Sequence, residues 1–401
     1  MNNLINTFAK KSLFSQLKKI KHGKLIISEG KKNYSFGSSA KLIGKIKVNN
    51  PIFYRHVLFG GSIGSSESYI QAYWDSSDLS KVIAIMSINE QTMDEMEGWF
   101  KFFLKPFFKF IHFLNNNTLD GSKKNIAQHY DLSNTFFSLF LDSSMMYSSG
   151  IYKNRSATLA EASSYKLDII CRKLELRKTD RVIEIGSGWG GFAIHAVKNF
   201  GCHVTTTTIS KQQYNYVKKK IKELRLEKHI TLLFKDYRDL KGSYDKLVSI
   251  EMIEAVGHRY YDSYFKVISN LLKKNGQALI QAITIKDQRY KQAIKSVDFI
   301  QKYIFPGSCI PSLTVIQNTL TNSTDMVINQ VDDIGHHYAI TLRQWRKNFI
   351  TNKFAINKLG FDDSFYRMWL FYLCYCEGGF MERAITDLHI HITKPHYRNQ
   401  I

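Results

Sequence analysis

The 401-residue sequence lacks three features that would each define a class of protein. Residues 1–24 contain no apolar core of signal-peptide length and no small-residue cleavage site, so we expect no secretory signal there. The five cysteines form no Cys-x-x-Cys pair and no zinc-type spacing. We therefore expect reduced thiols, no metal site and a cytoplasmic protein. No apolar run approaches the roughly 20 residues that cross a bilayer.

The net charge of +22 predicts attraction to a polyanion, either nucleic acid or the anionic face of a membrane. Residues 98–114, GWFKFFLKPFFKFIHFL, carry Lys101, Lys105 and Lys109 at every fourth position, which places them on one side of a helix. This segment is too short and too charged to span, but it suits the plane of the membrane interface. The alternative is an internal linker helix whose aromatic residues pack between domains or wall an acyl pocket.

Changes in sequence pattern predict three segments. Residues 1–97 read as a small α+β domain, residues 98–125 as an aromatic and basic linker, and residues 126–401 as alternating strands and helices. In the last segment, strands are predicted at 181–185, 202–209, 230–234, 246–250 and 277–285. This alternation predicts an α/β fold with a doubly wound, mostly parallel, Rossmann-like sheet.

A glycine turn follows the first of these strands, in RVIEIGSGWGG (181–191). Gly186, Gly188 and Gly190 would let a ligand approach the backbone at the carboxyl end of the strand. The spacing lacks the full dinucleotide pattern. Glu184 suits the methyltransferase variant of this turn, in which an acidic residue holds the charged amino-acid end of the cofactor.

Several long blocks occur in one order along the chain: QHYDLSNTFFSLFLDSSMMYSSGIY, IEIGSGWGG, TTISKQQ, DYRDL, SIEMIEAVGHRYYDSYF, KYIFPG, YAITLRQW and FYLCYCEGGFMERAITDLHIHITKP. In these blocks the sequence resembles the cyclopropane-fatty-acyl-phospholipid synthases and the related mycolic acid methyltransferases. The resemblance implies a class I methyltransferase domain that uses S-adenosylmethionine. Its implied substrate is an unsaturated acyl chain of a membrane phospholipid, converted to a cyclopropane fatty acid.

The resemblance also implies a set of cofactor contacts besides Glu184 and the glycine turn. These contacts are Tyr147, Ser148, Thr208, Gln213, Tyr237 and Arg238. Thr208 ends the second strand, where many nucleotide-binding folds place an acid for the ribose. Because Thr208 is not an acid, Gln213 is the expected ribose partner.

Ring closure needs a base to remove a proton. The family resemblance implies that a bound bicarbonate serves as this base. The resemblance assigns its ligands here to Glu254, Tyr338 and the backbone of Ile283. Two further positions, Cys and His in the family, are Ser149 and Gln281 in this chain. Both side chains can hydrogen-bond an anion, so a bicarbonate site stays open, but Gln cannot pass a proton on as His could. The reaction could therefore end in a methyl or methylene branch, with a partner reductase completing a methyl branch.

Two other function classes stay open from the sequence. The charge and the cofactor turn would also fit a nucleic-acid methyltransferase or RNA-binding protein, although no base-flipping or RNA-recognition motif is present. A catalytically inactive lipid-binding relative is disfavoured because Glu254, Tyr338 and the glycine turn are retained. We expect an enzyme peripheral to the inner membrane face that does not bind nucleic acid, and the resemblance suggests a homodimer.

Replacing Lys101, Lys105 and Lys109 together by Gln tests the membrane interpretation of residues 98–114. Each basic residue near an anionic surface contributes about 1 kcal/mol, so binding to anionic vesicles should weaken on the order of a hundredfold at low salt. Binding to neutral vesicles should change much less, and added salt should remove the difference. A triple variant that sediments with anionic vesicles like the unmodified protein would place the contact elsewhere.

Overall fold

The computed structural model describes residues 2–39, 41–94 and 132–398, and the chain divides into two compact units. The first unit comprises residues 1–132, 298–306 and 349–384, and the second comprises residues 133–297, 307–348 and 385–401. Neither unit is continuous in sequence. The segment boundaries expected from the sequence (1–97, 98–125 and 126–401) remain a prediction, but residues 126–132, 298–306 and 349–384 of the expected third segment belong to the first unit.

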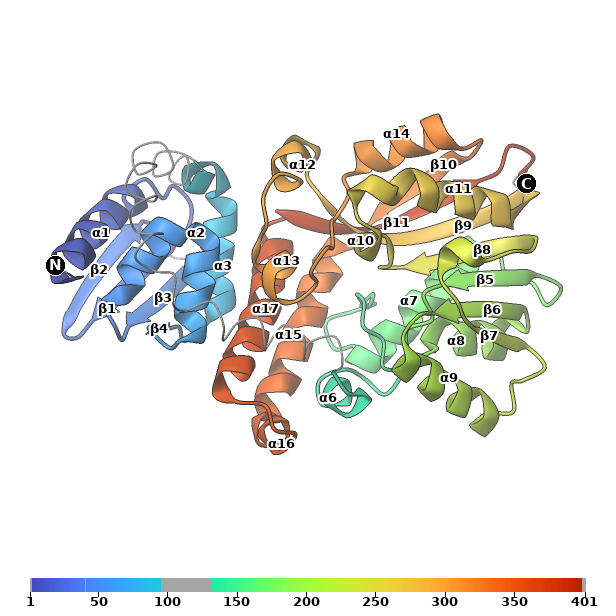
Figure 1. Cartoon of the computed structure of the whole chain (residues 1–401), viewed down its shortest axis with the longest axis horizontal. Helices are drawn as coiled ribbons and strands as arrows, with labels where there is room; N and C mark the ends of the chain where they lie inside the picture. Colours follow the sequence, from blue (N-terminus) through green and yellow to red (C-terminus); the bar gives the residue numbers. More distant parts are fainter. Residues whose placement is uncertain (1, 40, 95–131, 399–401) are drawn as a thin grey trace. The chain divides into compact units, whose positions relative to one another are not determined.

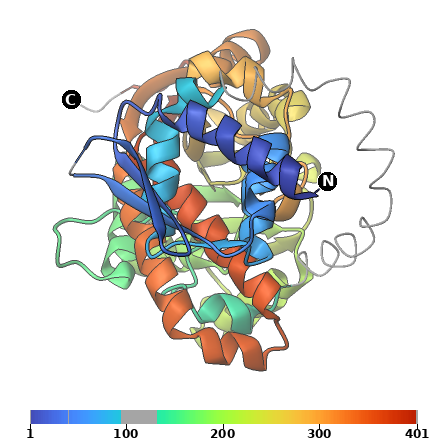
Figure 2. The ribbon, with the colours of Figure 1, turned by 90° about the vertical axis from the view of Figure 1, so that its left-hand side faces the viewer.

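The described part of the first unit contains a small sheet and several helices (Figures 1 and 2). The elements are α1 (Asn2–Leu17), β1 (Lys24–Glu29), β2 (Lys32–Gly37), β3 (Ile43–Val48), α2 (Ile52–Ile70), β4 (Trp74–Asp75), α3 (Leu79–Ile88), α13 (Phe299–Tyr303), α16 (Lys353–Lys358) and α17 (Asp363–Met381). The strand order is β2-β1-β3-β4, with β1 antiparallel to β2 and parallel to β3. Strands β1 and β3 lie within the stretches KLIISEG and AKLIGKIKVNN, whose alternation of apolar and polar residues is typical of strands.

Helix α17 joins this unit although it lies near the end of the chain. It packs so closely on α3 that a Cβ atom at Gly378 would lie 2.7 Å from the Cγ2 atom of Ile83. Arg367 donates hydrogen bonds to the carbonyl oxygens of Tyr69 (2.6 Å) and Trp74 (2.9 Å). Its guanidinium also lies 4.1 Å from the centre of the Tyr69 ring. Arg367 therefore fastens α17 to the end of α2 and the start of β4.

The second unit is built on a seven-stranded sheet (Figure 1). Its strands are β5 (Arg181–Ile185), β6 (His203–Thr208), β7 (Ile230–Phe234), β8 (Tyr244–Ile250), β9 (Leu272–Ile285), β10 (Val327–Asp333) and β11 (Ile385–Thr393). Its helices are α6 (Asn134–Ser138), α7 (Leu159–Lys173), α8 (Gly191–Phe200), α9 (Lys211–Glu223), α10 (Ile253–Val256), α11 (Tyr261–Leu271), α12 (Asp287–Ala293), α14 (Leu313–Ser323) and α15 (Gly335–Thr351), with 3-10 turns η1 (Tyr237–Asp239) and η2 (His258–Tyr260).

The strand order is β10-β11-β9-β8-β5-β6-β7. Strands β7, β6, β5, β8 and β9 are parallel, whereas β11 is antiparallel to β9 and β10 is antiparallel to β11. The predicted doubly wound sheet is confirmed, and the five predicted strands are β5 to β9. The antiparallel pair at one edge is a feature that the sequence pattern did not predict.

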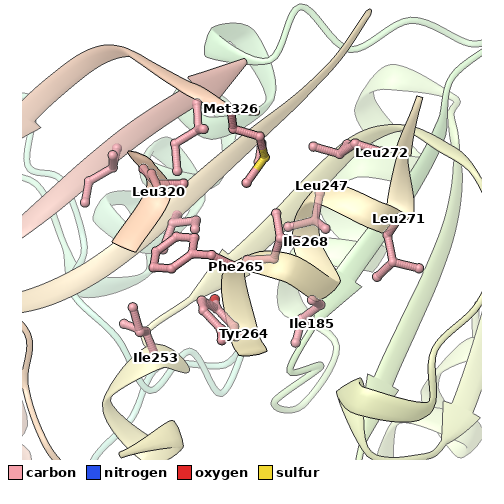
Figure 3. Packing of buried hydrophobic residues seen from close by; sticks show 14 of the residues in the cluster. Ile185, Leu247, Ile253, Tyr264, Phe265, Ile268, Leu271, Leu272, Leu320 and Met326 are labelled. Carbon is pink, nitrogen blue, oxygen red and sulfur yellow. The ribbon is translucent and has the colours of Figure 1, made fainter. Parts of the chain in front are cut away.

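Both faces of the central strands are covered. Nine of the fourteen residues of β9 are buried, which explains the nearly continuous apolar run in its second half. On one face, Tyr264, Phe265 and Ile268 of α11 pack against the sheet and against Leu320 of α14 (Figure 3). Because the strands are parallel, the carboxyl ends of β5, β6, β7, β8 and β9 meet at one edge of the sheet, where such folds bind ligands.

Two sequence-based expectations concern residues outside the described ranges. The lysine stripe at Lys101, Lys105 and Lys109 falls there, as does the expected linker 98–125. Within the ranges 2–39, 41–94 and 132–398, no helix combines the length and the apolar character needed to cross a membrane.

Replacing Arg367 by Met tests how far α17 stabilises the first unit. Met keeps much of the stem but leaves the carbonyl oxygens of Tyr69 and Trp74 without their charged donor, so the free energy of unfolding should fall by about 3 kcal/mol. Urea-induced unfolding measures the change. The control is Arg172→Met, which removes an exposed pair with Asp168 and should leave the unfolding curve unchanged. Equal curves for the two variants would contradict the role given to Arg367.

Candidate active site

The glycine turn lies where β5 ends and α8 begins. Gly186, Gly188 and Gly190 all have φ in the left-handed region, at 92°, 49° and 86°. The turn is closed by hydrogen bonds from Ser187 N to the carbonyl of Thr207 (2.7 Å) and from Gly190 N to the carbonyl of Ser187 (2.8 Å). A Cβ atom at Gly188 would meet no described atom within 4 Å. The turn thus presents backbone beside open space, which fits the close approach of a nucleotide-like ligand.

Glu184 sits just before the turn and is almost fully buried, at 3% exposure. Its carboxyl accepts a hydrogen bond of 2.5 Å from the hydroxyl of Thr206 in β6. Burial raises the pKa of Glu184 to about 8, partly opposed by the nearby Lys166 ammonium. A buried carboxyl of this kind gains most from a cationic ligand, because the cation would offset the cost of ionising it. This geometry fits the role expected for Glu184 toward the charged amino-acid end of S-adenosylmethionine.

The other expected cofactor residues of the β6 and β7 ends lie at the same edge of the sheet. The hydroxyl of Thr208 donates to the side-chain oxygen of Gln213 (2.8 Å), which orients that amide at the start of α9. Tyr237 and Arg238 lie in η1, directly after β7. The Tyr237 ring packs edge-on against another tyrosine, and Arg238 forms a two-pronged pair with Asp236 at 2.8 Å for each contact.

Tyr147 and Ser148 lie in the segment between α6 and α7. The ring of Tyr147 packs against Phe137 and Trp345, with ring centres 5.2 and 5.3 Å away. The Ser148 hydroxyl accepts a hydrogen bond of 2.6 Å from the ammonium of Lys166, which is fully buried. Burial lowers the pKa of Lys166 to about 8, while the carboxyls of Glu251 and other neighbours oppose this effect.

Three residues expected to bind bicarbonate converge instead on the carboxylate of Glu251. Oε1 accepts hydrogen bonds from the backbone N–H of Ser149 (2.9 Å) and from Nε2 of Gln281 (2.7 Å). Oε2 accepts a hydrogen bond of 2.6 Å from the hydroxyl of Tyr338. The Ser149 hydroxyl donates to the carbonyl of Gly150 (2.9 Å), so its backbone rather than its side chain faces the carboxylate.

Glu254, the carboxylate expected to hold the anion, lies next to this cluster in α10. Its Oε1 accepts a hydrogen bond of 2.6 Å from the backbone N–H of Ile283, whereas its Oε2 is buried without a hydrogen-bond partner among the described residues. Burial, together with the charge of Glu251, raises the pKa of Glu254 to about 8. Glu254 therefore holds a proton at neutral pH. Asp387 in β11, which accepts from Gln281 (2.8 Å), has its pKa raised by burial and by Glu251 as well.

Sequence reasoning missed three members of this cluster, namely Glu251, Lys166 and Asp387. Each carried a signal that could have been used. Glu251 is a carboxylate directly after an apolar strand, at the sheet edge where sites form. Lys166 lies among the buried residues of α7, four positions after Ala162 and four before Ile170. Asp387 is an acid within the strand sequence ITDLHIHIT, and a buried acid is rare unless it is paired.

The sheet order, the left-handed glycine turn and the acid at the end of β5 define a class I S-adenosylmethionine-dependent methyltransferase. The family model described as mycolic acid cyclopropane synthetase matches residues 117–390. The chain belongs to this family. Within the described residues, no group of three or more His, Cys, Asp or Glu is placed to hold a metal ion.

Two curated relatives illustrate the range of the family. Tuberculostearic acid methyltransferase UfaA1 of Mycobacterium tuberculosis is 35% identical over 328 residues, which cover 80% of this chain and 76% of the relative. Cyclopropane-fatty-acyl-phospholipid synthase of Escherichia coli is 33% identical over 344 residues, 85% of each chain. The two relatives differ in their named products.

Solved structures agree with this assignment. The mycolic acid cyclopropane synthase CmaA1 in complex with SAH and CTAB is 28% identical and superposes with a TM-score of 0.62, covering 68% of this chain and 98% of CmaA1. The cyclopropane synthase MmaA2 of Mycobacterium tuberculosis is 26% identical with the same TM-score, covering 69% of this chain and all of MmaA2. Coclaurine N-methyltransferase shares the fold. It is 17% identical and superposes with a TM-score of 0.60, covering 82% of this chain and 98% of its own.

Replacing Gly188 by Leu tests the glycine turn as the cofactor site. The side chain would occupy the open space beside the backbone, so S-adenosylmethionine should no longer raise the melting temperature, as it should for the unmodified protein. Gly30→Leu is the matched control, because Gly30 also has a positive φ (57°) and a Cβ atom there would likewise meet no described atom within 4 Å. Both variants place a leucine at a positive φ, and only the Gly188 variant should lose the ligand-induced shift. A full shift in Gly188→Leu would exclude this turn as the binding site.

Proposed function

We propose that this methyltransferase adds a methyl group from S-adenosylmethionine to the double bond of an unsaturated acyl chain in a membrane phospholipid and closes the product to a cyclopropane. The observation that carries the proposal is the placement of two features at one edge of the second unit's sheet. The cofactor turn follows β5, and the cluster of Glu251, Glu254, Gln281 and Tyr338 gathers at the ends of β8 and β9 and the start of α15.

An isolated alkene is a weak nucleophile, so the enzyme must hold it in a shaped site that excludes water. S-adenosylmethionine, when bound, supplies an electrophilic methyl group. Addition of that methyl leaves a positive charge on the acyl chain, and closing the ring then requires removal of a proton. Groups that stabilise a cation and accept a proton are therefore needed together. The Glu251 carboxylate, Tyr338 and the aromatic rings of Tyr147 and Trp345 are of the type required.

A second product class is supported by a specific observation. Gln281 stands where the family resemblance implies a His, and the chain is 35% identical to a methyltransferase named for tuberculostearic acid, a different product from a cyclopropane. If a hydride shifts along the acyl chain before the proton is lost, the same cation gives a methylene branch. A separate reductase would then convert it to a methyl branch.

Expression in a host without such an enzyme, fed with methyl-deuterated methionine, tests the proposal. Phospholipid acyl chains should gain one labelled carbon and lose one deuteron, detected by mass spectrometry. Proton NMR then separates a ring from a methylene or methyl branch. The Gly188→Leu variant is the control and should give no labelled lipid. Label that enters nucleic acid and leaves the lipids unchanged would overturn the proposal.

A further inference from the structure

Glu251 occupies the position in which a free anion was expected. Its carboxylate takes hydrogen bonds from Ser149 N, Gln281 Nε2 and Tyr338 Oη at 2.9, 2.7 and 2.6 Å. These are donors from three separate parts of the second unit, and together they use three of the four lone-pair positions that a carboxylate offers. The remaining position is on Oε2. The set of donors expected to bind bicarbonate is therefore already bound to a carboxylate of the chain itself.

The backbone at Glu251 is held in an unfavourable conformation. Its φ is +48°, in the left-handed region that residues with a Cβ seldom adopt, at a cost of roughly 1–2 kcal/mol. The backbone N–H of Glu251 donates to the carbonyl of Gln281 in β9 (2.8 Å), which ties the residue to that strand. Glycine would adopt this conformation without strain, so a glutamate here indicates that its side chain is needed.

The surrounding charges favour Glu251 as the ionised member of the cluster. It has three donors, whereas the Glu254 side chain has one described donor, and the Asp387 side chain accepts from Gln281 and itself lies within hydrogen-bond reach of Glu251. Lys166 is the buried cation whose charge most directly opposes the effect of burial on the pKa of Glu251. Burial raises the pKa of all three carboxyls, and Glu251 is the one with the most donors to stabilise its ionised form. Taken as a whole residue, Glu251 is only partly buried.

We propose that Glu251 is the catalytic base of this enzyme, an internal carboxylate in place of a free bicarbonate; this inference rests on the proposed methyl transfer to an acyl double bond. After methyl addition, a C–H bond of the new methyl group breaks and its electron pair forms the third C–C bond of the ring. The proton passes to Oε2 of Glu251 and from there to water. No oxidant or reductant is required. For the branched product, the electron pair instead forms the new C=C bond.

Glu251→Gly tests the proposal, because glycine removes the carboxylate, relieves the strained φ and leaves an anion-sized space. Lipid product formation should fall by about a hundredfold or more, the usual size of a general-base effect. Added bicarbonate should then raise the activity of this variant about tenfold or more, since it can occupy the vacated donors. The unmodified enzyme should keep its activity, within about twofold, in buffer freed of carbon dioxide.

Two further variants separate a catalytic role from a structural one. Glu251→Gln keeps the size of the side chain but cannot accept the proton, so it should be as inactive as the glycine variant and bicarbonate should not restore it. Glu175→Gly is the matched control, because Glu175 is an exposed glutamate with a similar φ of +52°. It should keep full activity and show no response to bicarbonate.

Binding of ¹³C-labelled bicarbonate, followed by NMR, provides a readout that needs no lipid product. The label should bind the Glu251→Gly variant and not the unmodified enzyme. If the unmodified enzyme binds the label or needs bicarbonate for turnover, the inference is overturned. If Glu251→Gly retains full activity without bicarbonate, it is overturned as well. If instead the unmodified enzyme binds S-adenosylmethionine but labels no lipid, the proposed function fails, and the bicarbonate-binding result still decides whether Glu251 fills the anion position.

Discussion

The parallel pairing of β8 with β9 is the constraint on which the geometry of the candidate site depends. Ile250 at the end of β8 pairs with Gln281, and Gln281 in turn pairs with His389 of β11 on its other side. This double pairing holds the Gln281 side chain where its amide reaches both Glu251 and Asp387. Because successive residues of a strand point to opposite faces, a shift of one residue would remove Gln281 from the cluster altogether.

The buried charges around this pairing are balanced by few cations. The carboxyl groups of Glu184, Glu251 and Asp387 lie near one buried ammonium, that of Lys166, and Glu254 lies next to Glu251. Burying several charges of one sign is costly, so burial raises the pKa of each of these carboxyls. The arrangement separates their roles: a neutral carboxyl can donate a hydrogen bond, whereas an ionised one can accept a proton or stabilise a cation.

The strands of the second unit could be predicted because their signal is local. RVIEI and ITLLF are apolar runs of strand length, and β5 and β7 coincide with them. The position of the glycine turn could be predicted as well, because the glycines directly follow RVIEI in the sequence. The donors around Glu251 could not be identified in this way, because Ser149, Gln281 and Tyr338 are far apart in sequence and one contributes only its backbone N–H. The assignment of α17 to the first unit depends on packing between distant segments, which local periodicity does not report.

The interleaved path of the first unit has a consequence for biosynthesis. Its strands and the helices α2 and α3 are made early, but α17, whose Arg367 and Gly378 pack against them, is made almost last. At typical rates of translation, on the order of tens of seconds separate the synthesis of α3 from that of α17. During that time the surface that α17 later covers is exposed on the nascent chain. The first unit therefore completes its core only after most of the polypeptide has been synthesised. Until then its exposed apolar surface is of the kind that chaperones bind.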